Sequence, residues 1–211
     1  MVRVADDRAL IVIDVQNDFC PGGALAVTEG DLVVAEINRI TGGFPVCVLT
    51  QDWHPAHHRS FAVNHPQGEP FSTVMMPYGE QVLWPAHCVQ GTPGAEFHPD
   101  LEVDAADLVL RKGFHEGIDS YSAFFENDRT TPTGLAGYLR ERGVRRLWLA
   151  GLATDYCVAD SAIDAAAAGF EVTVLEDACR AIDLDGSLAA AMRRMHERGV
   201  VFGRAADLPA D

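Results

Sequence analysis

A chain of 211 residues is long enough for one domain with a full hydrophobic core, and we expect residues 1–211 to form a single domain. Its formal net charge of −15 argues against nucleic acids and anionic membranes as partners. No apolar run approaches the ~20 residues of a membrane span, and the charged N-terminus lacks a signal-peptide pattern. The five cysteines have no paired spacing, so we expect reduced thiols and a cytoplasmic location.

Apolar runs alternate with helical patterns along the chain. The predicted strands cover residues 8–14, 45–50, 107–112, 147–150, 171–175 and 200–202. The predicted helices cover residues 32–40, 135–142, 158–168 and 188–198. The strands are continuously apolar, which favours burial on both faces, as in parallel sheets. The pattern therefore predicts a three-layer α/β/α sandwich around a mostly parallel, Rossmann-like sheet of about six strands.

The region from about residue 52 to 100 has little regular pattern and many Pro, Gly and His residues. A loop of this length in a compact domain is usually functional or contains an unrecognised element. We expect it to contribute residues that bind a metal and a substrate.

Four reactive side chains follow predicted strands: Asp14, Asp52, Lys112 and Cys157. In parallel sheets, ligands bind outside the carboxyl ends of the strands, so we expect the four to meet there. Cys157 also falls at the start of a predicted helix, where free N–H groups and the helix dipole lower the pKa of a thiol below about 8.5. Taken alone, three of these residues also have a structural interpretation. Asp14 could be a strand-end cap, Lys112 a solvated cation and Cys157 a buried structural cysteine.

Together, Asp14, Lys112 and Cys157 can carry out nucleophilic acyl transfer. Asp14 can take the thiol proton and return it to a leaving amine, and Lys112 can stabilise both anions. Because neighbouring strands lie about 4.8 Å apart, we expect the Lys112 strand to lie between those of Asp14 and Cys157. The Asp52 strand should then lie beyond the Asp14 strand.

Asp52 and His54 form half of a plausible metal site, since alternation along an extended segment puts both side chains on one side. The third ligand must come from the long loop. The residues alone leave five histidines open for this place: His57, His58, His65, His87 and His98.

Four segments, taken in order, resemble the isochorismatase-like cysteine hydrolases, and within them the nicotinamidases, also called pyrazinamidases. They are Ile13–Phe19, Gln51–Pro55, Trp84–Thr92 and Gly151–Val158. The resemblance implies a metal-dependent amidohydrolase that converts nicotinamide to nicotinate and ammonia through a cysteine thioester, and also pyrazinamide to pyrazinoate.

The resemblance also implies roles for individual residues. Cys157 is the nucleophile, Asp14 the base and Lys112 the third catalytic group. The N–H groups of Ala153 and Cys157 form an oxyanion hole, helped by a cis peptide between Leu152 and Ala153.

Further roles follow for the metal and the substrate ring. Asp52, His54 and His87 hold one divalent ion, which is zinc, iron or manganese. The fourth position varies in the family, and either His58 or water fills it. The residues implied to enclose the ring are Phe19, Leu25, Trp84, Tyr121 and Tyr156.

Three other functions compete with this interpretation. An N-carbamoylsarcosine amidase type would keep Asp14, Lys112 and Cys157 but would not need the three metal ligands. Isochorismatase itself lacks the cysteine nucleophile. A catalytically silent binding protein would not need to retain every reactive group. The sequence is compatible with a homo-oligomer but does not fix the oligomeric state.

Overall fold

The computed structural model describes residues 6–208, which contain a six-stranded sheet in the order β5-β2-β1-β6-β7-β8. Every neighbouring pair in this sheet is parallel. The strands are β1 (Arg8–Ile13), β2 (Cys47–Asp52), β5 (Leu108–Lys112), β6 (Arg146–Leu152), β7 (Glu171–Arg180) and β8 (Val201–Gly203). The predicted α/β class is confirmed.

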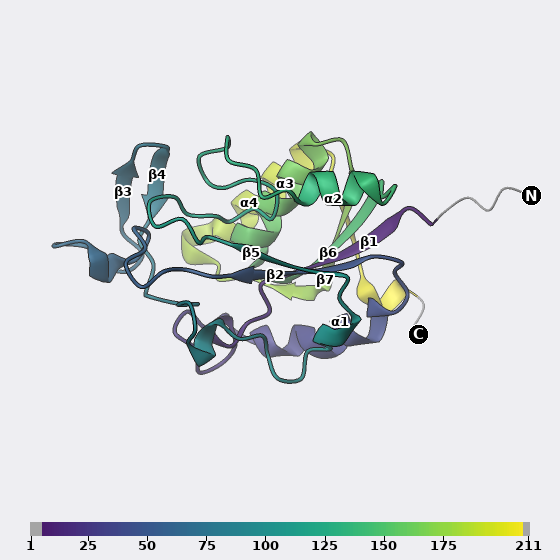
Figure 1. The fold of residues 1–211 in the computed structure, drawn as a ribbon, viewed down its shortest axis with the longest axis horizontal. Helices are drawn as coiled ribbons and strands as arrows, with labels where there is room; N and C mark the ends of the chain where they lie inside the picture. The colour runs from purple at the N-terminus through teal and green to yellow at the C-terminus, as the bar shows by residue number, and fades with distance from the viewer. Residues whose placement is uncertain (1–5, 209–211) are drawn as a thin grey trace, which may run out of the picture.

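Helices cover both faces of the sheet (Figure 1). Their bounds are α1 (Val33–Thr41), α2 (Leu135–Glu141), α3 (Ala159–Ala167) and α4 (Ser187–Glu197). One hydrophobic cluster joins α1 to one face of the sheet, and a second joins α2, α3 and α4 to the other. The molecule therefore has the three layers that the sequence predicts.

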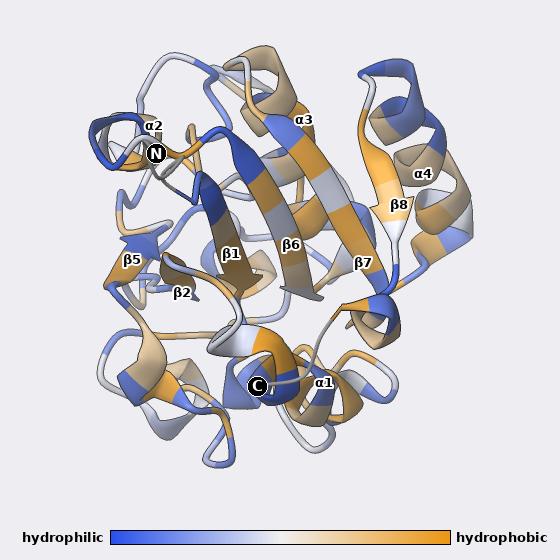
Figure 2. Cartoon of the chain, turned by 90° about the vertical axis from the view of Figure 1, so that its right-hand side faces the viewer, coloured by the Kyte–Doolittle hydropathy of each residue, from blue (hydrophilic) through white to orange (hydrophobic). Residues whose placement is uncertain are grey.

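The alternation of side chains along β1 explains this double burial. Ala9, Ile11 and Ile13 pack in the cluster with α2, α3 and α4, whereas Leu10 and Val12 pack in the cluster with α1. All five are almost fully buried. Figure 2 shows hydrophobic colours along the middle of β6 and β7 as well. A continuously apolar sequence is what a strand between two helical layers requires.

A small antiparallel hairpin, formed by β3 (Thr73–Met76) and β4 (Gly79–Val82), lies within the region expected to be an irregular loop. It stands apart from the central sheet (Figure 1). Each strand has four residues, and most of their side chains are partly or fully exposed. Strands of four residues are too short to give a clear hydrophobic period, which is why the sequence did not predict this pair.

The predicted position of the Lys112 strand was wrong. β5 is the edge strand, and β2 separates it from β1, while β1 and β6 are neighbours. Lys112 still reaches Cys157 because its long side chain passes over the carboxyl end of β2, and its Nζ lies 3.4 Å from the thiol Sγ. The Asp52 strand lies beyond the Asp14 strand as seen from β6, as expected.

Within residues 6–208, no helix combines the length and the apolar character needed to cross a membrane.

Candidate active site

The carboxyl edge of the sheet brings together the three groups predicted for acyl transfer. Asp14 follows β1, Lys112 ends β5, and Cys157 lies in a short π-helical turn, Thr154–Val158, between β6 and α3. The Lys112 ammonium lies 2.8 Å from Asp14 Oδ2 and 3.4 Å from Cys157 Sγ. It also donates to the carbonyl of Ser120 at 2.7 Å. A single buried cation therefore contacts both the carboxylate and the thiol.

Asp14 is fully buried, and Thr50 binds it twice. The Thr50 hydroxyl donates to Asp14 Oδ1 at 2.6 Å and accepts from the Asp14 backbone N–H at 3.1 Å. Burial raises the pKa of Asp14 to about 6, although Lys112 opposes the rise. Within residues 6–208 no group donates a hydrogen bond to Oδ2 beyond its ion pair with Lys112. This oxygen is therefore available to accept a proton from the thiol.

The expected lowering of the Cys157 pKa was wrong. Burial raises the pKa of this thiol well above its ordinary value, although Lys112 opposes the rise. The side chain is only 7% exposed, so the loss of hydration outweighs the helix terminus on which the expectation rested. Burial therefore favours the thiol over the thiolate, and a reaction of this group as a nucleophile would require a base to take its proton.

The turn that carries Cys157 is fixed by backbone contacts. The Ala153 carbonyl accepts hydrogen bonds from the N–H groups of Tyr156 and Val158 at 3.2 and 3.1 Å. The peptide between Leu152 and Ala153 is cis, as the resemblance implies. Gly151 has a φ of +119°, and a Cβ there would lie 2.1 Å from the Ile13 carbonyl. Glycine thus lets β6 end close beside the residue that precedes Asp14.

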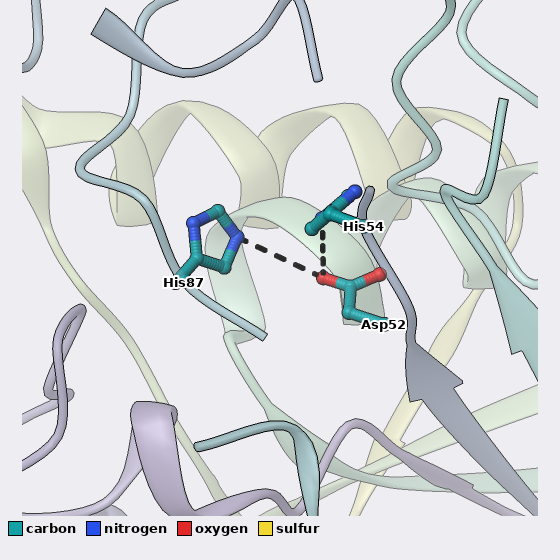
Figure 3. A group of neighbouring side chains, drawn as sticks. All are labelled: Asp52, His54 and His87. Atoms are coloured by element: carbon teal, nitrogen blue, oxygen red, sulfur yellow. Dashed lines mark ion pairs between the residues drawn. The ribbon is translucent and has the colours of Figure 1, made fainter. Parts of the chain in front are cut away.

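A second group joins Asp52 at the end of β2 to His54 and His87 (Figure 3). The two imidazole Nε2 atoms lie 3.6 and 4.0 Å from Asp52 Oδ2. All three residues are at most 4% exposed. Asp52 also connects the two groups, because its other oxygen lies 2.5 Å from the Lys112 ammonium.

The donor set of this second group fits a divalent metal. The remaining ring nitrogens bind backbone carbonyls, His54 Nδ1 at Gly113 (2.7 Å) and His87 Nδ1 at Pro85 (2.8 Å). These contacts place an N–H on Nδ1 of each ring and turn Nε2 towards Asp52, an orientation typical of metal-binding histidines. Burial lowers the pKa of His87 to about 4, so this imidazole is neutral at pH 7, as a ligand must be.

His58 does not join this group. Its Nδ1 contacts the Ser60 hydroxyl at 2.7 Å, and its Nε2 contacts the Ile118 carbonyl at 3.2 Å. Its nearest potential co-ligands are His54 and Asp119 rather than Asp52 and His87. With both ring nitrogens engaged by protein groups, His58 does not match the predicted fourth ligand. The other histidines left open by the sequence, His57, His65 and His98, also lie outside the group.

Cys157 and two residues of the second group, Asp52 and His87, line one cavity. All five residues predicted to enclose a ring line it: Phe19, Leu25, Trp84, Tyr121 and Tyr156. Asp52, His87, Ala153 and Cys157 complete the predicted part of its lining. Asp119 and Ile182 also line it, and the sequence did not point to either. Both lie in irregular loops outside the four recognised segments, so no periodicity or motif marks them.

Gln16 is a further residue of this site, and it could have been found, since it lies in the first recognised segment. Its side-chain Nε2 donates to the Asp52 carbonyl at 2.9 Å, and its Oε1 accepts from the Asp52 N–H at 2.8 Å. The amide of Gln16 thus fixes the backbone of Asp52, whose carboxylate contacts both Lys112 and the two histidines.

Gly113 offers a test of the metal-binding group. Its φ is +66°, and a Cβ would lie 2.4 Å from His54 Cε1. We expect Gly113→Ala to displace His54 and to weaken zinc binding by at least about tenfold, the usual scale for disturbing a ligand's support. Zinc affinity, measured by calorimetry on metal-free protein, checks this.

Gly117→Ala is the matched control, because no atom lies within 4 Å of a Cβ at that position. It should bind zinc as the parent does. Unchanged zinc affinity in folded Gly113→Ala would contradict the assignment of His54 as a ligand.

The fold is a parallel α/β sheet, and a buried cysteine, a carboxylate and a lysine meet at its carboxyl edge. These features define the general class, an α/β protein equipped for nucleophilic chemistry. The isochorismatase domain matches residues 8–207. The chain therefore belongs to the isochorismatase family, and the resemblance predicted from the four segments is confirmed.

Relatives within the family are similar over nearly their whole length. The nicotinamidase of Acinetobacter baylyi is 55% identical over 199 residues, 94% of this chain and 93% of that protein. The structure of the Acinetobacter baumanii nicotinamidase/pyrazinamidase superposes with a TM-score of 0.95 at 55% identity, covering 98% of this chain and 100% of that one.

Two further solved structures are informative for the ligands they contain. PnC1 from L. infantum, in complex with nicotinate, has a TM-score of 0.85 at 39% identity and covers 98% of this chain and 96% of that one. The pyrazinamidase of Pyrococcus horikoshii, in complex with zinc, has a TM-score of 0.75 at 39% identity and covers 94% of this chain and 99% of that one.

Proposed function

We propose that this protein hydrolyses nicotinamide to nicotinate and ammonia, and pyrazinamide to pyrazinoate and ammonia. The observation that carries the proposal is that a single cavity contains both the Cys157 thiol and the metal-binding pair Asp52 and His87. The activities named for the similar proteins support it, as does nicotinate in the complex with PnC1.

In the proposed reaction, Asp14 takes the thiol proton as Cys157 Sγ attacks the carboxamide carbon. The oxyanion that forms accepts hydrogen bonds from the N–H groups of Ala153 and Cys157, which are worth about 3 kcal/mol each at such sites. Asp14 then returns the proton to the amide nitrogen and the C–N bond breaks. Ammonia departs, and the acyl group remains on Cys157 as a thioester. Water then adds to the thioester with Asp14 as base, and nicotinate leaves as the thiol is restored.

Lys112 has a distinct part in this scheme. Although burial lowers its pKa, the carboxylates of Asp14 and Asp52 raise it well above its ordinary value, so the ammonium stays charged. It lies within 3.4 Å of the thiol and 2.8 Å of the Asp14 carboxylate. We therefore assign Lys112 to stabilising the thiolate that forms during attack.

We propose that Asp52, His54 and His87 hold one divalent ion, zinc, iron or manganese, with water at any remaining positions. When bound, such an ion is a Lewis acid that can hold the pyridine ring nitrogen and so orient the carboxamide. Zinc in the similar pyrazinamidase supports this assignment.

The cavity walls suit a flat aromatic amide. Trp84 and Tyr156 stand nearly perpendicular, with ring centroids 4.8 Å apart, and Tyr121 packs edge-on against both. We propose that these rings, together with Phe19 and Leu25, enclose the substrate ring. Aromatic walls with few polar groups favour a neutral, planar ligand.

Other features of the chain support a single-domain cytoplasmic enzyme. The family match extends over nearly the whole chain. All five cysteines are free and buried, which is expected for a protein in a reducing compartment.

The proposal is tested by incubating the zinc-loaded protein with nicotinamide and measuring both products. Equal amounts of nicotinate and ammonia are expected. Release of neither, from folded protein with zinc bound, would overturn the proposed function. N-carbamoylsarcosine serves as the comparison substrate and should be hydrolysed far more slowly, since it has no ring for the aromatic walls to hold.

A further inference from the structure

The β3–β4 hairpin contributes one buried polar side chain, Gln81, which is 1% exposed. Its amide nitrogen lies 2.9 Å from Asp119 Oδ2, 2.8 Å from Tyr121 Oη and 2.8 Å from the Val82 carbonyl. Asp119 and Tyr121 both line the cavity. Through Gln81, a hairpin outside the central sheet holds two residues of the cavity wall.

The amide oxygen of Gln81 also has hydrogen-bond partners. Its Oε1 accepts hydrogen bonds from the Tyr78 hydroxyl and the Asn127 side-chain amide, both at 3.1 Å. Asn127 in turn accepts from the Tyr121 N–H at 3.0 Å. The two amide hydrogens are shared among the three acceptors, Val82, Asp119 and Tyr121. Because the oxygen is held by Tyr78 and Asn127, the amide has one favourable orientation, and its nitrogen stays beside Asp119 and Tyr121.

The contacts of Tyr121 give this arrangement a chemical consequence. Its oxygen accepts from Gln81 at 2.8 Å and from the Trp84 indole N–H at 3.0 Å. A phenol hydroxyl can accept hydrogen bonds and can also donate one. The oxygen thus acts as an acceptor, and among residues 6–208 no group accepts a hydrogen bond from the hydroxyl itself. Burial raises the pKa of Tyr121 well above its ordinary value, so the hydroxyl keeps its proton.

We propose that Gln81 is a positioning residue for substrate binding. It holds the Asp119 carboxylate and the Tyr121 hydroxyl in the cavity wall, so that the Tyr121 O–H is left to donate to an acceptor atom of a neutral aromatic amide. This inference rests on the proposed function, and it gives the β3–β4 hairpin a part in substrate affinity rather than in chemistry.

Gln81→Met tests the inference, because methionine has similar length but cannot make these hydrogen bonds. In the zinc-loaded enzyme we expect KM for nicotinamide to rise about tenfold while kcat stays within about threefold, the pattern of lost ground-state binding. The same change placed in Cys157→Ala should weaken nicotinamide binding, measured by calorimetry, by a similar factor.

Glu80→Gln is the matched control, since Glu80 is the exposed neighbour on the same strand. It should leave KM and kcat unchanged. Tyr78→Phe removes a hydroxyl that donates to Gln81 and accepts a long hydrogen bond from the Asp119 N–H, and it leaves the Gln81 side chain in place. It should raise KM in the same direction by a smaller factor. This milder variant supplies the test if Gln81→Met does not fold.

The dependence on Tyr121 separates positioning from general destabilisation. In a Tyr121→Phe background, which has no oxygen to position, the rise in KM caused by Gln81→Met should shrink to less than about threefold. An undiminished rise there, an unchanged KM in the parent background, or a fall in kcat at constant KM would each overturn the inference. If the parent enzyme itself releases no ammonia from nicotinamide, the proposed function has failed instead.

Discussion

Cys157→Ala should reduce the turnover of nicotinamide by at least about 10⁴-fold, the scale on which loss of a covalent nucleophile acts. Alanine cannot form the thioester, and Asp14 then has no thiol to deprotonate. Water is a weaker nucleophile than a thiolate, and in the variant it would have to attack the amide directly. Steady-state ammonia release measures the effect.

Ligand binding should survive this change. The cavity walls are provided mainly by other residues, among them Trp84, Tyr121 and Tyr156, and Cys157 contributes only a small side chain. We expect Cys157→Ala to bind zinc as the parent does and nicotinamide within about threefold of the parent, measured by calorimetry. A variant that retains a tenth or more of the parent turnover would contradict the nucleophile assignment.

Removal of the metal should have the second largest effect. A chelator should reduce nicotinamide hydrolysis at least about 100-fold, because the substrate would lose the contact that fixes ring and carboxamide together. Zinc or manganese added in excess should restore the rate.

Benzamide distinguishes a metal that orients the ring from one that merely stabilises the fold. It has nearly the shape of nicotinamide but no ring nitrogen, so it should be a far poorer substrate of the metal-loaded protein. Its slow hydrolysis should change little on chelation, since it gains nothing from the ion. Equal rates for the two amides, or full nicotinamide turnover by metal-free protein, would show that the ion does not position the ring.

Much of this site could be predicted from the sequence because its groups follow continuously apolar strands. Asp14, Asp52 and Lys112 end or follow such strands, so a parallel sheet brings them to one edge whatever the strand order. The order itself could not be predicted in this way. A rule based on strand spacing placed Lys112 between Asp14 and Cys157, but a long side chain crosses β2 from the edge of the sheet.

The sequence was least informative where contacts depend on irregular chain paths. Asp119 and Ile182 reach the cavity from loops. Gln81 contacts two residues of the cavity wall, Asp119 and Tyr121, from a hairpin too short to give a period. The pKa of Cys157 was also misjudged, because helix position can be read from the sequence whereas the degree of burial cannot.

The central claim, that amide hydrolysis passes through a thioester on Cys157, is tested most directly by trapping that intermediate. Zinc-loaded protein is mixed with nicotinamide and quenched in acid within its first turnovers. The protein is then digested, and the masses of its peptides are measured by mass spectrometry. The account predicts one nicotinoyl group on the peptide that carries Cys157, removed by hydroxylamine and absent from Cys157→Ala. Active enzyme that never acquires this group under rapid quenching, or that carries it on another residue, would contradict the account.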